Sequence, residues 1–222
     1  MFVLGIDPGL TRCGFGGVRR TRAGLEAVCH GVITTSPSTA HPRRLRDLQR
    51  QLTAIIVEHR PDVVVVERVF FQTNVRTAIG VSQASGLALA AADEFGCDVA
   101  QYTANEVKLA ITGDGAAEKR QTQAMVARTL KLAELPKPFD AADALALAIH
   151  HLSIASYARM ASSTLGARSG AGEQAGSPSG FGNARVATTF GGVKLAPAPS
   201  GATGAPRAVG AVAAVGAKGK AS

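Results

Sequence analysis

Short apolar runs and longer stretches with helical periodicity divide most of the chain into predicted strands and helices. Continuous apolar runs typical of buried strands lie at 2–7 and 62–67, and the second contains four consecutive valines, which favours a central parallel position buried on both faces. Extended segments at 13–18 and 25–34 follow the first run closely enough to form an antiparallel meander with it. A short fifth strand is predicted at 97–102.

Apolar residues recur on one helical face at 42–58, whose other faces carry four arginines. The stretch 75–95 has helical spacing and small residues that would allow another element to approach closely. Further helices are predicted at 104–112, 118–132 and 140–158. Because strands come first and helices then alternate with strands, we expect an α/β fold with a mixed five-stranded sheet flanked by helices on both faces.

Composition changes sharply near residue 160. Residues 161–222 hold 13 of the 25 glycines, and their six basic residues against one acid, Glu173, give a charge of +5 out of the chain's +8. Few large apolar residues occur there, so the segment cannot bury enough surface to offset the entropy of ordering. We therefore predict a compact domain over 1–160, long enough to bury a core, and a flexible, low-complexity basic tail over 161–222.

The basic balance favours an anionic partner, most often nucleic acid, although charge alone is equally consistent with solubility. Three widely spaced cysteines, Cys13, Cys29 and Cys97, form no Cys-x-x-Cys pair and argue against a disulfide framework or a zinc site. No apolar run has the length of a membrane span and no leader opens the chain, so we expect a cytoplasmic protein with no membrane association.

Four carboxylates occupy positions that suit a metal-dependent nuclease. Asp7 and Glu67 each end a predicted buried strand, where α/β sheets keep their sites. Asp140 and Asp143 open the last predicted helix and, three residues apart, share one of its faces. Singly, the first two are also consistent with turn or strand-end residues, and the helix pair with acids that complement a helix N-terminus. Together, four such anions would repel one another, and divalent cations would relieve that repulsion.

Several ordered motifs resemble the RuvC family of Holliday junction resolvases, within the ribonuclease H-like superfamily. The matching stretches span residues 1 to about 155 and comprise Leu-Gly-Ile-Asp-Pro-Gly at 4–9, Val-Glu-Arg-Val-Phe at 66–70, Gln-Ala-Ser-Gly at 83–86, Ala-Glu-Lys at 117–119 and Asp-Ala-Ala-Asp-Ala-Leu-Ala at 140–146. The resemblance implies a ribonuclease H-like fold and an endonuclease that resolves four-way DNA junctions in recombination and repair by paired nicks, leaving 5′-phosphate and 3′-hydroxyl ends.

The resemblance also implies residue roles. Asp7, Glu67, Asp140 and Asp143 would be the catalytic metal ligands, although some relatives have histidine at the position of Asp140. Oxygen ligands favour two Mg²⁺ ions, which Mn²⁺ can replace. Lys119, and less clearly Lys108, would contact DNA near the scissile phosphate, and Lys119 is equally consistent with a solvated helix lysine.

Further implications concern DNA and partners. Phe70 would stack on unpaired bases while Phe71 anchors its loop. The resemblance implies a homodimer that meets the two-fold symmetry of a four-way junction, with 75–95 as the interface helix, and a RuvA–RuvB branch-migration complex as partner. Close packing of 75–95 on the sheet is an equally good interpretation of its small residues.

Three alternatives share features with the sequence. Actin-like sugar kinases open with a similar Gly-Ile-Asp-Pro-Gly strand but need two lobes, for which about 160 residues are too few. A compact nuclease-like family linked to ribosomal RNA maturation shares the opening motif but not Ala-Glu-Lys or the paired acids at 140 and 143. A junction-binding protein without catalysis would not need all four acids.

Overall fold

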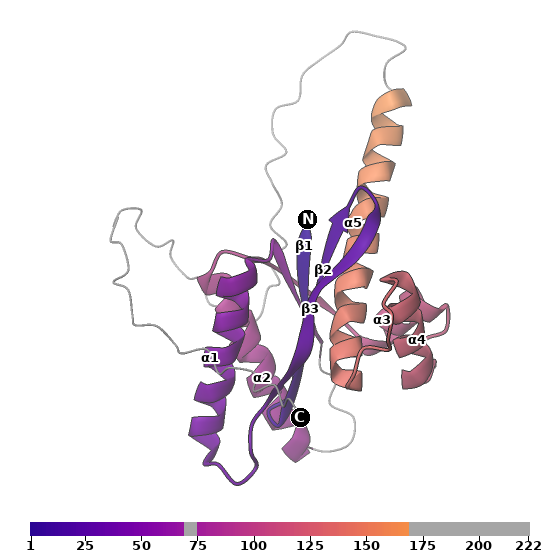
Figure 1. Ribbon diagram of the computed structural model, residues 1–222. Helices are drawn as coiled ribbons and strands as arrows, with labels where there is room; N and C mark the ends of the chain where they lie inside the picture. The colour runs from indigo at the N-terminus through magenta and orange to yellow at the C-terminus, as the bar shows by residue number, and fades with distance from the viewer. Residues whose placement is uncertain (69–74, 169–222) are drawn as a thin grey trace, which may run out of the picture. The chain divides into compact units, whose positions relative to one another are not determined.

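The computed structural model describes residues 1–68 and 75–168, which all fall in one compact unit (Figure 1). Its elements in chain order are β1 (Phe2–Asp7), β2 (Arg12–Thr21), β3 (Gly24–Thr34), α1 (His41–His59), β4 (Val63–Glu67), α2 (Val75–Glu94), β5 (Asp98–Tyr102), α3 (Ala104–Thr112), α4 (Lys119–Thr129) and α5 (Phe139–Arg168). Every predicted element is present, and most boundaries lie within one or two residues of those expected.

The five strands form one mixed sheet in the order β3-β2-β1-β4-β5. β1, β2 and β3 make the predicted antiparallel meander, whereas β4 lies parallel to both β1 and β5. The carboxyl ends of β1, β4 and β5 therefore meet at one edge of the sheet, which is the lower edge in Figure 1. Asp7 and Glu67, the last residues of β1 and β4, therefore lie at this edge.

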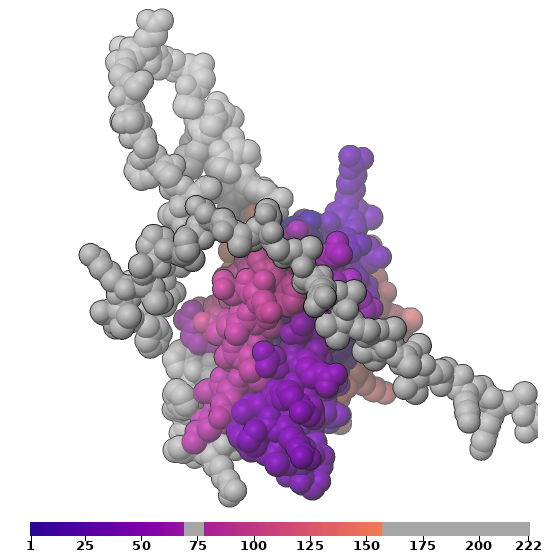
Figure 2. Space-filling model, turned by 90° about the vertical axis from the view of Figure 1, so that its left-hand side faces the viewer, coloured from indigo at the N-terminus to yellow at the C-terminus, as the bar shows by residue number. Residues whose placement is uncertain are grey.

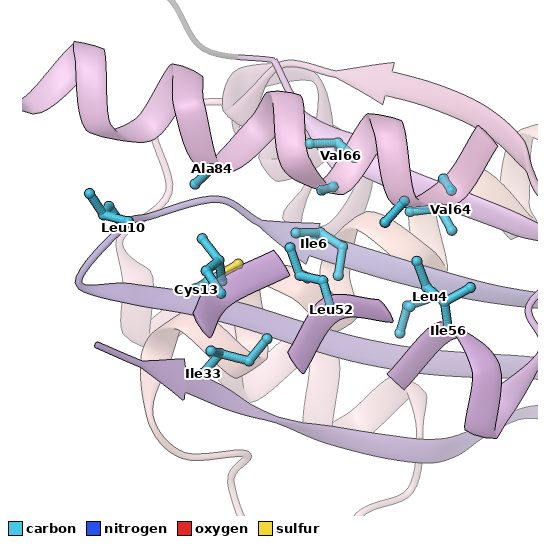
Figure 3. Close-up of a cluster of buried hydrophobic side chains, with 14 residues drawn as sticks. Leu4, Ile6, Leu10, Cys13, Ile33, Leu52, Ile56, Val64, Val66 and Ala84 are labelled. Atoms are coloured by element: carbon cyan, nitrogen blue, oxygen red, sulfur yellow. The ribbon is translucent and has the colours of Figure 1, made fainter. Parts of the chain in front are cut away.

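One face of the sheet is covered by α1 and α2, which Figure 2 shows lying over it in purple and magenta. Leu48, Leu52 and Ile56, spaced four residues apart on α1, are fully or almost fully buried. All three belong to the core cluster that includes Ile6 and Val64, and Figure 3 shows Leu52 and Ile56 beside strand residues of that cluster. Helical spacing thus places the predicted apolar face of α1 on the sheet.

The opposite face carries α5, with α3 and α4 packed against it (Figure 1). The four valines of β4 divide between the two faces: Val64 and Val66 join the core under α1 and α2, while Val63 and Val65 join the core under α5. Alternation along a strand explains the division. The predicted burial of β4 on both faces is confirmed.

α5 is longer than predicted at its carboxyl end. It begins at Phe139, one residue before the expected start, but continues to Arg168 rather than ending at 158. The prediction ended the helix where the composition changes, near residue 160. A helix that is already formed extends through alanine and leucine at little cost, and both occur in 159–168. In residues 1–68 and 75–168, no helix is both long enough and apolar enough to cross a membrane.

Glycines set the distance between α5 and the sheet. A Cβ atom on Gly5 of β1 would overlap the carbonyl oxygen of Ala144, and one on Gly14 of β2 would overlap that of Asp140. A Cβ on Gly16 would lie 2.7 Å from the backbone nitrogen of Leu145. The first two turns of α5 consequently rest on strand backbone with no side chain between them.

Substitution of these glycines should destabilise the protein. Gly5→Ala and Gly14→Ala should each lower the free energy of unfolding by about 1–3 kcal/mol, because backbone cannot move aside as a flexible side chain can. Urea unfolding monitored by circular dichroism measures the change. Gly115→Ala is the matched control, since its Cβ would meet only ordinary contacts at 3.7 and 4.0 Å. Equal stability of all three variants would contradict the close approach of α5.

Candidate active site

Asp7 and Glu67 stand side by side at the carboxyl ends of two adjacent parallel strands. The register pairs Ile6 of β1 with Val66 of β4, so the next residue on each strand is one of these acids. Each of the two carboxyl groups shifts the pKa of the other, as expected of acids in close contact. The parallel pairing therefore brings together two acids that lie 60 residues apart in sequence.

Asp143 reaches the same place from α5. It lies one turn into the helix and lines a cavity of about 200 Å³ together with Asp7 and Glu67. The full lining consists of Asp7, Glu67, Ala104, Val107, Lys108, Lys119, Thr122, Asp143, Ala146 and Leu147. Three acids and two lysines thus face one small space whose remaining wall is largely apolar.

The two lysines come from helices whose starts are fixed by reciprocal capping. Thr103 caps α3: its Oγ1 accepts from the Glu106 backbone N–H at 3.2 Å, and the Glu106 side chain accepts from the Thr103 N–H at 2.7 Å. This places Lys108 in the second turn of α3. Lys119 begins α4, where the N–H of Glu118 donates to Gln121 Oε1 at 2.9 Å. The Lys119 ammonium lies 3.7 Å from Asp143 Oδ2.

Burial and mutual repulsion perturb the acids strongly. Desolvation and the charges of Glu67, Asp143 and Asp140 raise the pKa of Asp7 to about 8. Burial, and then the charge of Asp143, raise the pKa of Glu67. Burial also raises the pKa of Asp143, opposed by Lys119. Strong perturbation by burial plus specific charged neighbours in a cleft is the pattern expected of a functional site.

Asp140 is the predicted acid that the structure places outside the cavity lining. It shares the first turns of α5 with Asp143, but its carboxylate faces β2, where Arg12 Nε and Nη2 donate to Asp140 Oδ2 at 3.0 and 2.7 Å. Its charge still acts on Asp7 and Asp143. The expectation that the two helix acids point into one site is therefore only partly met.

The donor chemistry suits a hard divalent cation. Carboxylate oxygens are the ligands that Mg²⁺ prefers, and a cation would offset the repulsion that raises the Asp7 pKa. Among the side chains that the structure describes, in 1–68 and 78–156, no three acids, histidines or cysteines already enclose a metal position. Asp143 and Asp140 instead face Lys119 and Arg12. A cation that took Asp140 as a ligand would have to displace Arg12 from it.

Sequence reasoning missed two residues near the acids. Arg12 carries no local signal of its role, because its partner is 128 residues away. Thr122 lines the cavity one turn after Lys119, and helical spacing from Lys119 could have suggested it. Phe70 and Phe71, predicted to contact bases and to anchor a loop, lie outside the described residues.

The fold and the site together define a class. A mixed five-stranded sheet of this order, flanked by helices and with acids at the ends of the adjacent strands β1 and β4, is the ribonuclease H-like arrangement of metal-dependent nucleases. A family model described as crossover junction endodeoxyribonuclease RuvC matches residues 3–151. The chain belongs to this family of metal-dependent Holliday junction resolvases, so the family expected from the sequence motifs is confirmed.

Comparisons with individual proteins support the same family assignment. A curated crossover junction endodeoxyribonuclease RuvC of Salinispora arenicola is 54% identical over 153 residues, which cover 68% of this chain and 87% of that protein. The structure of Thermus thermophilus RuvC is 36% identical with a TM-score of 0.65, over 72% of this chain and 97% of that one. The same protein in complex with a Holliday junction substrate matches with 37% identity and a TM-score of 0.66, over 72% and 96% of the two chains.

Asp7 should destabilise the metal-free protein at neutral and alkaline pH. Its folded pKa of about 8 exceeds the ordinary value of 3.8, so the folded state holds this proton more tightly than the unfolded state. The resulting stability is fully present below about pH 4 and is lost as pH rises through about 8. Asp7→Asn should therefore match the parent near pH 4. In EDTA at pH 8 it should exceed the parent by roughly 2 kcal/mol or more, since one pKa unit is worth about 1.4 kcal/mol.

Urea unfolding across this pH range measures the difference. Glu58→Gln, at an exposed position on α1, is the matched control for the loss of one carboxylate. A constant offset between Asp7→Asn and the parent at every pH would contradict the raised pKa.

Proposed function

We propose that Asp7, Glu67 and Asp143, joined by Asp140, form the catalytic centre with which this RuvC family endonuclease cuts four-way DNA junctions. The observation that carries the proposal is the convergence of three perturbed acids and two lysines on one cavity at the carboxyl edge of the sheet. The relative from Thermus thermophilus, whose complex contains a Holliday junction, supports the substrate class.

The four acids would hold two Mg²⁺ ions, for which Mn²⁺ can substitute. When bound, such ions supply the Lewis acidity that activates a water for attack on a phosphodiester and stabilises the departing oxygen. The protein's contribution is to present several carboxylate oxygens within one cavity, fixed by two strand ends and one helix. The apolar wall formed by Val107, Ala146 and Leu147 keeps the charges in surroundings where they interact strongly.

The two lysines would bind the scissile phosphate of the DNA rather than remain paired with the acids. Lys119 lies at the mouth of the cavity with 63% of its side chain exposed, so its ammonium can leave Asp143 for an arriving phosphate. There it would neutralise the charge that develops as the phosphodiester is cut. Lys108, which is partly buried in the same lining, would act in the same way from α3. The products would be nicks with 5′-phosphate and 3′-hydroxyl ends.

Removing any of the acids should abolish cleavage and spare binding. Asp7→Asn, Glu67→Gln, Asp140→Asn and Asp143→Asn should each slow nicking of a synthetic mobile junction by at least about 100-fold, because several kcal/mol of transition-state stabilisation are lost. Junction affinity in EDTA should stay within a few-fold of the parent, since binding rests on phosphate contacts and shape. Denaturing gels and band shifts measure the two quantities.

The exposed acid Glu58, near the end of α1, provides the control for these variants. Glu58→Gln should cut at the parental rate. A site variant that also cuts at the parental rate would remove its residue from the proposed centre. A parent that binds junctions but never nicks them with Mg²⁺ or Mn²⁺ would favour a binding protein instead.

A homodimer formed through α2 would present two such centres to the two-fold symmetric junction. The outward face of α2 supports this interface: Ile79 is 52% exposed, and no described atom lies within 4 Å of a Cβ built on Gly86. Ala90, one turn further along the same face, is exposed as well. An isoleucine beside small residues suits close packing against a second copy, related by a two-fold axis.

Charge on this face should therefore separate the subunits. Ile79→Lys should weaken the dimer by roughly tenfold or more, because the buried apolar area of one side chain is lost on each subunit and a charge is added. Sedimentation velocity over a concentration series measures the change. Val57→Lys on α1, at a position with similar exposure of 47%, is the control and should leave the dimer intact. Equal weakening by both would contradict an interface on α2.

The remaining parts of the proposal concern Phe70, the basic segment 161–222, most of which lies outside the described residues, and other proteins. Phe70 would stack on unpaired bases at the crossover. The segment 161–222, with its charge of +5, would add phosphate contacts without junction selectivity. A RuvA–RuvB branch-migration complex would deliver the junction. The protein would carry out this cleavage in the cytoplasm.

A further inference from the structure

Arg12 and Asp140 form a contact that the proposed nuclease chemistry does not use. Two guanidinium nitrogens of Arg12, Nε and Nη2, donate to one carboxylate oxygen, Asp140 Oδ2, at 3.0 and 2.7 Å. Arg12 is the first residue of β2, and Asp140 lies in the first turn of α5. Charge-assisted hydrogen bonds of this length are among the stronger side-chain contacts in proteins.

Backbone packing, rather than the reach of a long side chain, brings the two residues together. Arg12, Gly14 and Gly16 alternate along β2 and share one of its faces. A Cβ on Gly14 would overlap the carbonyl oxygen of Asp140 itself, so the strand and the first turn of the helix have a fixed separation. The Arg12 side chain therefore starts on the strand face that the first turn of α5 approaches.

The same packing explains why the two helix acids face different ways. Asp143 lines the cavity and lies 3.7 Å from the Lys119 ammonium on the α4 side. Asp140 turns toward β2 and is not part of the lining. It remains near enough for its charge to raise the pKa of Asp7 and of Asp143. Asp140 is thus close to the cavity but bound elsewhere.

We propose that Arg12 is a positioning residue that holds the Asp140 carboxylate away from the cavity, so that the DNA-free protein presents three acids to a divalent cation and not four. To become a ligand, Asp140 has to exchange both hydrogen bonds from Arg12 for the cation. Arg12 therefore competes with the metal for this carboxylate and lowers metal affinity in the absence of DNA. The inference rests on the proposed function, because it assumes that the cavity is where the cation binds.

A double-mutant cycle on the full-length protein tests this inference, with Mn²⁺ as the probe. Free Mn²⁺ is counted by its paramagnetic resonance signal in DNA-free protein at constant ionic strength, for the parent, Arg12→Gln, Asp140→Asn and the double variant. Arg12→Gln should bind Mn²⁺ about three- to tenfold more tightly than the parent, as expected for the loss of one partly exposed ion pair. In the Asp140→Asn background the same substitution should change affinity less than about twofold.

Two further variants separate geometry from charge. Arg12→Lys keeps the positive charge but cannot donate from two nitrogens of a planar group, so its Mn²⁺ affinity should lie between those of the parent and Arg12→Gln. Arg22→Gln, in the exposed turn between β2 and β3, changes net charge equally and should bind Mn²⁺ as the parent does. Thermal unfolding in EDTA verifies that each variant is folded.

The outcomes are distinct. Tighter binding by Arg12→Gln that disappears without Asp140 supports the inference. The same gain in both backgrounds would show that Arg12 acts only as a distant charge, and no gain in either would show that the ion pair does not compete with the metal. Both results overturn the inference while leaving the catalytic centre in place. Mn²⁺ binding that is absent, or that survives in Asp143→Asn, would instead overturn the proposed metal centre and the inference with it.

Discussion

The direct contact between α5 and the backbone of two strands determines the rest of this structure. Gly5, Gly14 and Gly16 leave no side chain between the sheet and the first turns of the helix. The spacing that results sets the depth at which Leu145 and Leu147 enter the core and the height at which Asp143 stands over the strand ends. The geometry of the candidate site thus depends on how closely a helix can approach a sheet.

Stability and function oppose each other at this edge. The apolar walls that hold the acids in place also strip them of water, and the pKa of Asp7 is raised first by that burial and only then by its neighbours. Lys119 and Arg12 offset part of the repulsion from outside the cluster, one on each side of α5. The folded protein thus keeps acids close together that would be more stable apart, which is the arrangement expected where a cation is to be bound.

Much of this architecture could be predicted because its signals are local. The valine run of β4, the apolar face of α1 and the acids that end β1 and β4 all follow from spacing within a few residues. What could not be predicted depends on contacts between distant segments. The orientation of Asp140 follows from Gly14 and Arg12, more than 120 residues earlier, and the length of α5 depends on propagation from a helix start that packing stabilises. The residue pattern within a single segment predicts neither the orientation of Asp140 nor the length of α5.

The order in which the chain supplies its acids has a consequence for the cell. Asp7 and Glu67 belong to strands near the amino end, but Asp143 is 136 residues beyond Asp7, on the last helix. During synthesis the early strands leave the ribosome well before α5. The unfinished chain therefore lacks both Asp143 and the helix that packs on one face of the sheet. A chain truncated before α5 carries the same deficit. A copy that ends before α5 therefore lacks one acid of the candidate site together with the helix that holds it in place.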